Sequence, residues 1–319
     1  MDFHLDADQR AILDAVDTIN ARHAGAGRIR ELGGDEPSYD HDLHKHLREA
    51  GFLDLALDDR PLDAALVAAA VARQLGVVAA AYHALVLPCL GVDAEGPIAI
   101  VAAESPGPAR FAADAEVVVT VADGSVSAVR PKPGSVARVG SRLGWPIGDV
   151  AGIDAGEALP DARPDEVRAR WRVALALELV GSMSGALDLT VAHVTDRRQF
   201  GRPIGSFQAV QHGLAKCAVA IEGARWLAYE AAWSGDWTAA ATALAAAMRA
   251  AERVRRDTHQ FTGALGFTTE YDLHLWTMRL PALAIEAGTI GSPAVAAATH
   301  QWPIARNGAT GLDNAEGRL

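Results

Sequence analysis

Apolar side chains recur at steps of four residues, and once of three, throughout residues 167–194. This period places them on one side of an α-helix and predicts a single long amphipathic helix. A helix of that length covers its apolar side by packing against other long helices, so the pattern favours a helical bundle. The residues that carry the pattern are Val167, Trp171, Leu175, Leu179, Met183, Leu187, Val191 and Val194.

Further helices are predicted after this one. A second long helix starts near Ser206, and a third, rich in alanine, runs from Thr238 to about Thr262. The glycines of residues 263–267 break the helical pattern, and a last helical stretch starts at Asp272. The inner side of the second helix is expected to carry Phe207, Val210, Leu214, Cys217, Ile221 and Trp226.

The first half of the chain contains two kinds of sequence pattern. Residues 3–90 have helical apolar spacing, whereas β-branched runs after residue 91 predict strands. Asp123-Gly124 between two such runs predicts a hairpin, and the loop-rich stretch that follows is expected to add few strands. We therefore predict a helical N-terminal domain over 1–90, a small β domain over 91–163 and a C-terminal helical bundle over 164–319.

Composition and charge exclude several classes of partner. The chain of 319 residues is half apolar and has 40 Asp and Glu against 29 Lys and Arg, a formal net charge of −11. Such a chain repels phosphate backbones and anionic lipids, so neither nucleic acid nor a membrane is an expected partner. Its longest apolar run, residues 64–72, is much shorter than the about 18 residues of a membrane span. Two cysteines and no visible targeting segment lead us to expect a cytoplasmic location.

Several familiar catalytic patterns are missing from the sequence. No Glu-x-x-His or Asp-x-x-His occurs, which excludes the usual di-iron site of a bundle. Residues 181–185 have the glycine spacing of a nucleophile elbow, but Met183 replaces the serine and helix packing is the better interpretation. No Walker loop or dinucleotide fingerprint is present. His41, His44 and His46 are interpreted as a solvated polar face, so no metal site is predicted.

Two segments have the composition of a site for a polyanionic ligand. Residues 196–208 place arginines at a helix end, and residues 260–267 contain glycines that let a ligand approach the backbone closely. On composition alone, an ordinary basic helix end and an ordinary glycine cap are the favoured interpretations.

These two segments nevertheless resemble, nearly residue for residue, the flavin-contacting segments of the acyl-CoA dehydrogenase family. Residues 196–208 read Asp-Arg-Arg-Gln-Phe-Gly-Arg-Pro-Ile-Gly-Ser-Phe-Gln, and residues 260–271 read Gln-Phe-Thr-Gly-Ala-Leu-Gly-Phe-Thr-Thr-Glu-Tyr. Ala264 stands where the family usually has a second glycine. The resemblance covers most of the chain and implies a mainly α fold: a helical N-terminal domain, a reduced middle β domain and a C-terminal four-helix bundle. It also implies FAD as the cofactor.

In that family both segments reach across a dimer interface to the ADP half of the neighbouring subunit's FAD. The resemblance therefore implies that Arg197 pairs with pyrophosphate oxygens, a task suited to planar arginine donors. The glutamines and the Gly263 backbone would supply hydrogen bonds. The implied cofactor-binding residues are Arg197, Gln199, Phe200, Gln208, Gln260, Gly263 and Ala264.

The catalytic base of the family has no clear counterpart here. The family removes an α-proton from an acyl-CoA with a glutamate found at one of two positions. Ala287 occupies the first position, with Glu286 one residue early and turned by about 100° on a helix, and Trp171 occupies the second. Glu286 is thus a weak candidate base, for which a solvated or structurally paired carboxylate is the favoured alternative. Arg172 matches an arginine near the family's active site, and is either a substrate contact or a surface residue with a snorkelling side chain.

The middle domain also departs from the family. The Thr-Glu-Pro strand and loop, which hold the isoalloxazine and the thioester in the family, have no counterpart between residues 91 and 164. The chain therefore resembles the trimmed subunit of a heteromeric actinobacterial acyl-CoA dehydrogenase, a heterotetramer with a second dehydrogenase subunit. By analogy its substrate would be a sterol side-chain CoA thioester and its electron acceptor an electron-transfer flavoprotein.

Two other functions remain open from the sequence. One is a self-sufficient, homo-oligomeric acyl-CoA dehydrogenase that uses Glu286 as its base. The other is a flavin-free helical protein that keeps the bundle for assembly.

Overall fold

The computed structural model describes residues 4–301, except for residues 35–36, 58, 155 and 290–291. Helices come first along the chain, and aspartates cap two of them. Asp6 accepts a hydrogen bond from the Gln9 backbone at 2.8 Å, and Asp40 accepts one from the Leu43 backbone at 3.0 Å. The helices are α1 (Ala7–His23), α2 (Ala26–Glu31), α3 (His41–Glu49) and α4 (Pro61–Arg73), followed by the π-helix η1 (Tyr82–Val86) and the 3-10 helix η2 (Leu87–Cys89).

Two small sheets follow. The first has the strand order β1-β3-β4-β7 and the second β2-β6-β5, and β1 pairs with β3 in parallel. The Ala122 backbone donates to Ser125 O at 2.9 Å in the turn between β3 and β4, so the hairpin predicted at Asp123-Gly124 is confirmed. The strands are β1 (Ile98–Ala102), β2 (Pro108–Arg110), β3 (Val117–Val121), β4 (Val126–Val129), β5 (Ala137–Val139), β6 (Ile147–Asp149) and β7 (Glu157–Ala158), with the 3-10 helix η3 (Ala112–Asp114).

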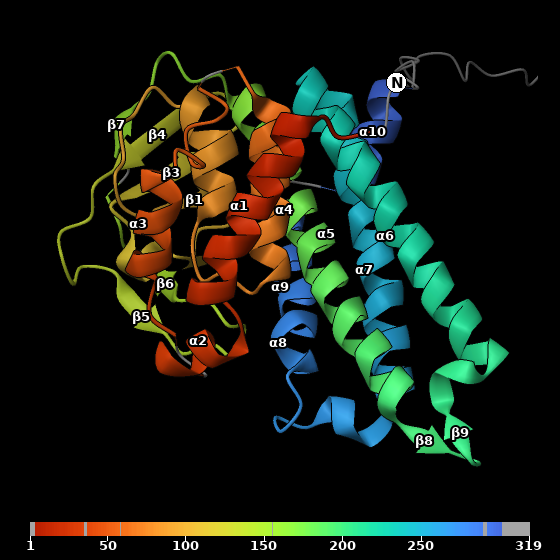
Figure 1. The fold of residues 1–319 in the computed structure, drawn as a ribbon. Coiled ribbons are helices and arrows are strands. Elements are labelled where there is room, and N and C mark those ends of the chain that lie inside the picture. The colour runs from red at the N-terminus through yellow and green to blue at the C-terminus, as the bar shows by residue number, and fades with distance from the viewer. Residues whose placement is uncertain (1–3, 35–36, 58, 155, 290–291, 302–319) are drawn as a thin grey trace, which may run out of the picture.

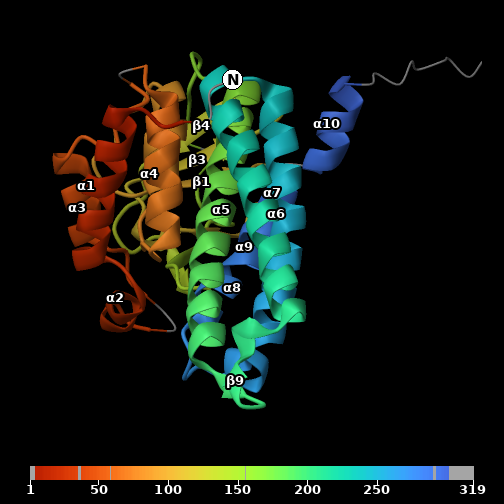
Figure 2. The ribbon, with the colours of Figure 1, turned by 45° about the vertical axis from the view of Figure 1, so that its right-hand side comes forward.

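Three long helices lie side by side in the C-terminal part (Figure 1). They are α5 (Pro164–Asp196), α6 (Gln208–Ser234) and α7 (Trp237–Thr262), and they confirm the three predicted long helices within a few residues. Figure 2 shows α8 and α9 behind them. The other elements are β8 (Arg198–Gln199), β9 (Arg202–Pro203), the 3-10 helices η4 (Ile204–Ser206) and η5 (Gly263–Phe267), and the helices α8 (Leu273–Thr277), α9 (Arg279–Thr289) and α10 (Pro293–Gln301).

The amphipathic prediction for α5 is wrong over its first two thirds. Between residues 167 and 186 nearly every side chain of α5 is buried, because α4, α6, α7 and η1 cover it from different sides. Val191, predicted to face inward, is 43% exposed. By length and composition α5 resembles a membrane span, but 83% of its most apolar window is buried inside the fold, as in the core helix of a water-soluble protein. On α6, Cys217 and Ile221 are buried, whereas the other residues predicted to face inward are half-buried.

Two glycines allow α5 to lie close to α4. A Cβ atom at Gly181 would be 2.3 Å from Ala69 O, and one at Gly185 would be 2.6 Å from Arg73 O. Both distances are far below van der Waals contact, so the helices pack backbone to backbone here. The interpretation of residues 181–185 as a packing motif is therefore confirmed.

The prediction of a solvated histidine face is wrong for His44, which is 6% exposed. Its Nδ1 lies 2.7 Å from the Tyr39 hydroxyl and its Nε2 lies 2.9 Å from Glu95 O. The ring stacks edge-on against His83, whose Nε2 lies 2.8 Å from Gly96 O. Burial lowers the pKa of both histidines, and that of His83 falls to about 3. Both rings are therefore neutral in the folded protein at pH 7.

We expect His83 to make the protein sensitive to acid. Because its pKa is about 6.5 in the unfolded chain and about 3 in the fold, the unfolded chain takes up a proton first as the pH falls. Stability contributed by neutral His83 is complete above pH 6.5 and declines toward pH 3, by at most about 1.4 kcal/mol per pH unit. Urea unfolding at pH 7, 6 and 5 should show a smaller decline for His83→Gln than for the wild type. Equal declines would contradict this role for His83.

Candidate cofactor and active-site region

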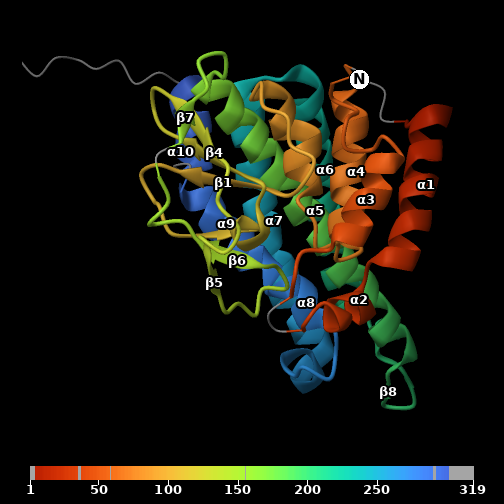
Figure 3. The ribbon, with the colours of Figure 1, turned by 90° about the vertical axis from the view of Figure 1, so that its left-hand side faces the viewer.

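A cavity of about 510 Å³ lies between the strands and helix α9. Its walls come from β1, β2, the loop over residues 139–143, and α9, which Figure 3 shows beside the strands. Most of the lining is apolar, as is usual for a ligand pocket. Polar atoms gather on one side, where Arg110, Trp171 and Glu286 meet.

Glu286 accepts hydrogen bonds on both carboxylate oxygens. Arg110 Nε donates to Oε2 at 2.6 Å, and Trp171 Nε1 donates to Oε1 at 2.8 Å. The Tyr82 hydroxyl donates to the same Oε1. The Glu286 side chain is 15% exposed and remains part of the cavity lining.

Arg110 is the centre of this cluster. Its Nη2 donates to Glu178 Oε2 at 2.8 Å and to the Tyr82 hydroxyl at 2.6 Å, so a second carboxylate holds it from α5. The Arg110 and Glu178 side chains are 4% and 8% exposed. Burial acts to lower the pKa of Arg110, but the carboxylates of Glu178 and Glu286 outweigh burial and hold it well above its usual value. The cluster is therefore a hydrogen-bonded triad of one arginine and two glutamates within an apolar region.

A second buried arginine lies near the cluster, against the same tryptophan ring as Arg110. Arg279, at the start of α9, donates to Gly144 O at 2.8 Å and to two backbone oxygens after α4. Its guanidinium lies 4.4 Å from the centre of the Trp145 ring, and that of Arg110 lies 4.5 Å from the same ring. Burial lowers the pKa of Arg279 to about 9. This second arginine therefore ties α9 to the loop before β6.

The sequence singled out Glu286 but gave no indication of its partners Arg110 and Glu178. Arg110 is 68 residues from Glu178 and 176 residues from Glu286, so no local spacing relates them. One signal was available: Glu178 interrupts an apolar run inside the most regular helix of the chain. A carboxylate there has to find a buried partner.

The two positions used for the base in related enzymes hold Ala287 and Trp171, both buried. Glu286, one residue earlier, lies within hydrogen-bond distance of Trp171 and is structurally paired. Arg172 is 2% exposed, so its interpretation as a surface residue is wrong. The Arg172 guanidinium lies 3.8 Å from the centre of the Trp237 ring, and burial lowers its pKa to about 10. Arg172 is not part of the lining of the cavity beside Glu286.

The two predicted ADP-side segments lie at one end of the bundle, because α6 and α7 are consecutive and antiparallel (Figure 1). One is the hairpin β8–β9 that precedes α6, and the other is η5 after α7. Gly263 has φ +61°, a conformation that favours glycine. Each predicted residue is exposed: Arg197, Gln199, Phe200, Gln208, Gln260, Gly263 and Ala264.

These exposed residues are open to a ligand. Within the described part of the chain the Arg197 guanidinium makes no hydrogen bond or ion pair, so its donors are available to phosphate oxygens. Phe200 is 92% exposed at φ +53°, an unusual conformation for a phenylalanine, and its ring centre lies 6.1 Å from that of Phe207. Among the described residues, no group of three or more His, Cys, Asp or Glu side chains could hold a metal ion.

Comparison with known proteins identifies the fold. The model of the acyl-CoA dehydrogenase C-terminal domain matches residues 169–292. Superposition on the ChsE4-ChsE5 complex from Mycobacterium tuberculosis gives a TM-score of 0.72 at 22% identity, covering 93% of this chain and 96% of that chain. A steroid ACAD variant, Tcur3481-Tcur3483, also gives 0.72, at 23% identity over 91% and 95% of the two chains.

Two proteins similar to this chain in sequence are named acyl-CoA dehydrogenases. Acyl-CoA dehydrogenase IpdE2 of Mycobacterium tuberculosis is 29% identical over 301 residues, 85% of this chain and 90% of that protein. Its counterpart in Mycolicibacterium smegmatis is 40% identical over 105 residues, about a third of either chain. Residues 169–292 therefore match the C-terminal domain of acyl-CoA dehydrogenases, and the whole chain has the fold of that family. The predicted fold class is confirmed, and the prediction of FAD as cofactor agrees with the family.

We expect the Arg110 cluster to dominate local stability. Arg110→Met should lower the free energy of unfolding by about 3 to 5 kcal/mol, because it removes the guanidinium that pairs directly with the buried Glu178 and Glu286. Arg130→Met is the matched control, since Arg130 pairs with Glu116 at the surface, where a pair contributes about 0 to 1 kcal/mol. Urea unfolding of both variants measures the difference. Similar losses would mean that the cluster is no more important than a surface pair.

Proposed function

We propose that this chain is one subunit of an FAD-dependent acyl-CoA dehydrogenase assembled from two different subunits. The complex, a heterotetramer, would catalyse α,β-dehydrogenation of an acyl-CoA thioester. This chain would contribute the ADP side of the FAD site to its partner, and the partner would supply the catalytic base.

The observation that carries this proposal is the state of Glu286. A general base needs a lone pair that reaches the proton it removes. Among the described residues that line the cavity, Glu286 is the one carboxylate, and its oxygens accept from Arg110, Trp171 and Tyr82. Oε1 accepts from both Trp171 and Tyr82, and Oε2 accepts from Arg110, so taking up a substrate proton would cost Glu286 its ion pair with Arg110. The carboxylate is better suited to holding Arg110 than to catalysis.

The exposed segments support the cofactor role. Arg197, Gln199 and Gln260 are exposed. They belong to segments at one end of the bundle (Figure 1), which a neighbouring subunit can reach. Arginine donors suit a pyrophosphate, and the open backbone at Gly263 admits close approach. FAD, when bound in such an assembly, supplies the hydride acceptor.

Similar proteins support the assembly and the substrate class. One solved relative is a complex of two named chains, ChsE4 and ChsE5, and another is described as a steroid ACAD. We therefore propose a sterol side-chain CoA thioester as the substrate and an electron-transfer flavoprotein as the acceptor. The cytoplasm is the proposed location.

The cofactor role predicts a difference in flavin content. The chain expressed alone should be colourless or weakly flavinylated, and co-expression with an adjacent acyl-CoA dehydrogenase gene should give a yellow complex. Arg197→Ala should weaken FAD binding in that complex by about tenfold to a hundredfold, the effect of a lost charge-assisted hydrogen bond. Absorbance at the flavin band relative to protein measures both effects. Full FAD occupancy in the chain alone, or in the variant at low FAD, would contradict the proposal.

The proposed division of labour predicts that Glu286→Gln leaves turnover by the complex largely intact. Loss of a true general base costs about a hundredfold or more in rate. Steady-state turnover of a sterol-CoA or a medium-chain acyl-CoA measures this, with flavin content as the control for assembly. A hundredfold loss at unchanged flavin content would make this chain a self-sufficient enzyme.

A further inference from the structure

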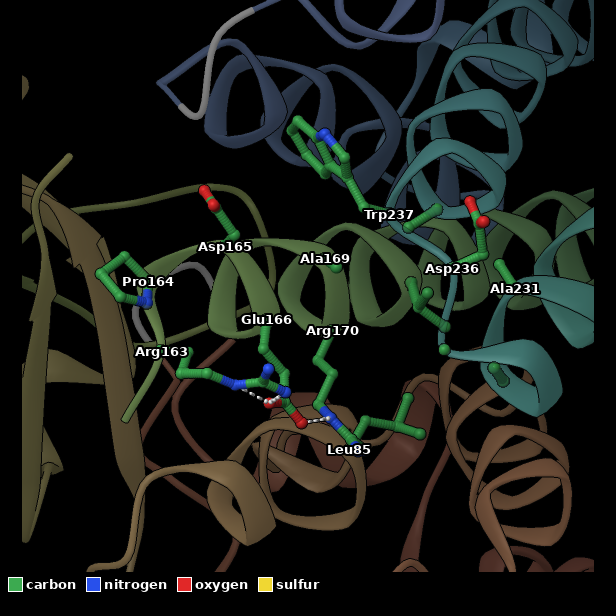
Figure 4. Close-up of a pocket in the computed structure, with 14 residues that line it drawn as sticks. Leu85, Arg163, Pro164, Asp165, Glu166, Ala169, Arg170, Ala231, Asp236 and Trp237 are labelled. Atoms are coloured by element: carbon green, nitrogen blue, oxygen red, sulfur yellow. Dashed lines mark hydrogen bonds and ion pairs between the residues drawn. The ribbon is translucent and has the colours of Figure 1, made fainter. Parts of the chain in front are cut away.

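A second cavity, of about 550 Å³, lies on the opposite side of α5 from the Arg110 cluster. Trp171 and Glu178 face the cluster, whereas Glu166, Ala169, Arg170 and Val173 of the same helix line this pocket (Figure 4). The two cavities share no lining residue. The pocket is therefore a separate site, and what it binds does not depend on the function proposed above.

The floor of the pocket is apolar and made of small side chains. Ala169, Ala231 and Ala240 come from three different helices and are each at most 5% exposed. Trp237 forms one wall, and Leu85 of η1 lies on the opposite side (Figure 4). Alanines at the meeting of three helices leave room that larger side chains would fill. The space suits an aliphatic chain.

One edge of the pocket attracts an anion. Glu166 Oε2 accepts from Arg163 Nη2 at 2.6 Å and its Oε1 accepts from Arg170 Nε at 3.2 Å, so one carboxylate faces two guanidinium groups. Burial acts to raise the pKa of Glu166, but the hydrogen bond from Arg163 and the charge of Arg170 lower it overall. The Nη atoms of Arg170 make no hydrogen bond to any described residue, and the side chain is 33% exposed. They are available to a second carboxylate.

The rest of the rim limits the charge of the ligand. Asp165 and Asp236 lie on the pocket rim away from the two arginines (Figure 4). Their carboxylates repel a polyphosphate such as the nucleotide end of coenzyme A. A ligand with one negative charge next to Arg170 and an otherwise apolar body gains the attraction of the arginine and keeps its charge away from Asp165 and Asp236.

We propose that this pocket binds an aliphatic monocarboxylate, with its carboxylate on Arg170 and its chain over Ala169 and against Trp237. Charge and shape both contribute: the guanidinium selects the acid over the alcohol, and the alanine floor admits the chain. A short fatty acid, the free acid of an acyl thioester, has this chemistry.

Calorimetric titration of the purified chain with octanoate tests the proposal, with octan-1-ol as the neutral ligand of equal length. Arg170→Gln should weaken octanoate binding by about tenfold and leave octanol binding within twofold. Arg73→Gln, which removes the same charge from an exposed pair with Asp188, should change neither. Ala232→Leu narrows the pocket from its rim and should weaken both ligands.

Three results would overturn the proposal. The first is unchanged octanoate affinity in Arg170→Gln. The second is an equal loss of affinity in Arg73→Gln, which would mean that net charge alone causes the effect. The third is loss of binding in Ala282→Leu, which narrows the cavity beside Glu286, without loss in Ala232→Leu. Melting temperatures of all variants near the wild-type value exclude unfolding as the cause.

Discussion

The structure depends on the placement of one buried cation. Arg110 lies at the end of β2 and is held by Glu178 of α5 and Glu286 of α9, with Tyr82 of η1 bonded to it as well. A guanidinium buried to this extent is tolerated only when carboxylates and hydrogen bonds compensate for its lost hydration. Strand, bundle and π-helix therefore have to come together in one arrangement. The same ion pairs fix the positions of Arg110 and Glu286, which both line the cavity.

The same interaction connects stability with function. The three donors that compensate Glu286 also hold its carboxylate in place at the edge of the cavity. The carboxylate that lines the cavity is thus part of the structural ion-pair cluster. At the far end of the bundle Phe200 and Arg197 are exposed, and the Phe200 ring lies edge-on to that of Phe207.

Helix α5 separates two different environments. Its Trp171 side belongs to the charged cluster, and its Ala169 side forms the floor of the second pocket. Over residues 167–186, α5 is buried on nearly all sides, because α4 and η1 pack against it on one side and α6 and α7 on another. Gly181 permits the closest of these contacts, since a Cβ atom there would meet the backbone of α4. The polar sites at its first half are therefore placed on a rigid element.

The sequence by itself determined the local elements and the family. A four-residue apolar step predicted α5, Asp123-Gly124 predicted the β3–β4 turn, and residues 196–208 carried the resemblance to flavoproteins. These features are set by neighbours in the chain, whose spacing fixes dihedral preference and periodicity. Only the tertiary structure decided which sides of α5 are buried, that His44 is internal, and that Arg110 meets Glu178 and Glu286. Periodicity indicates the face on which a side chain lies, but its partner is chosen by packing between distant segments, 176 residues apart for Arg110 and Glu286.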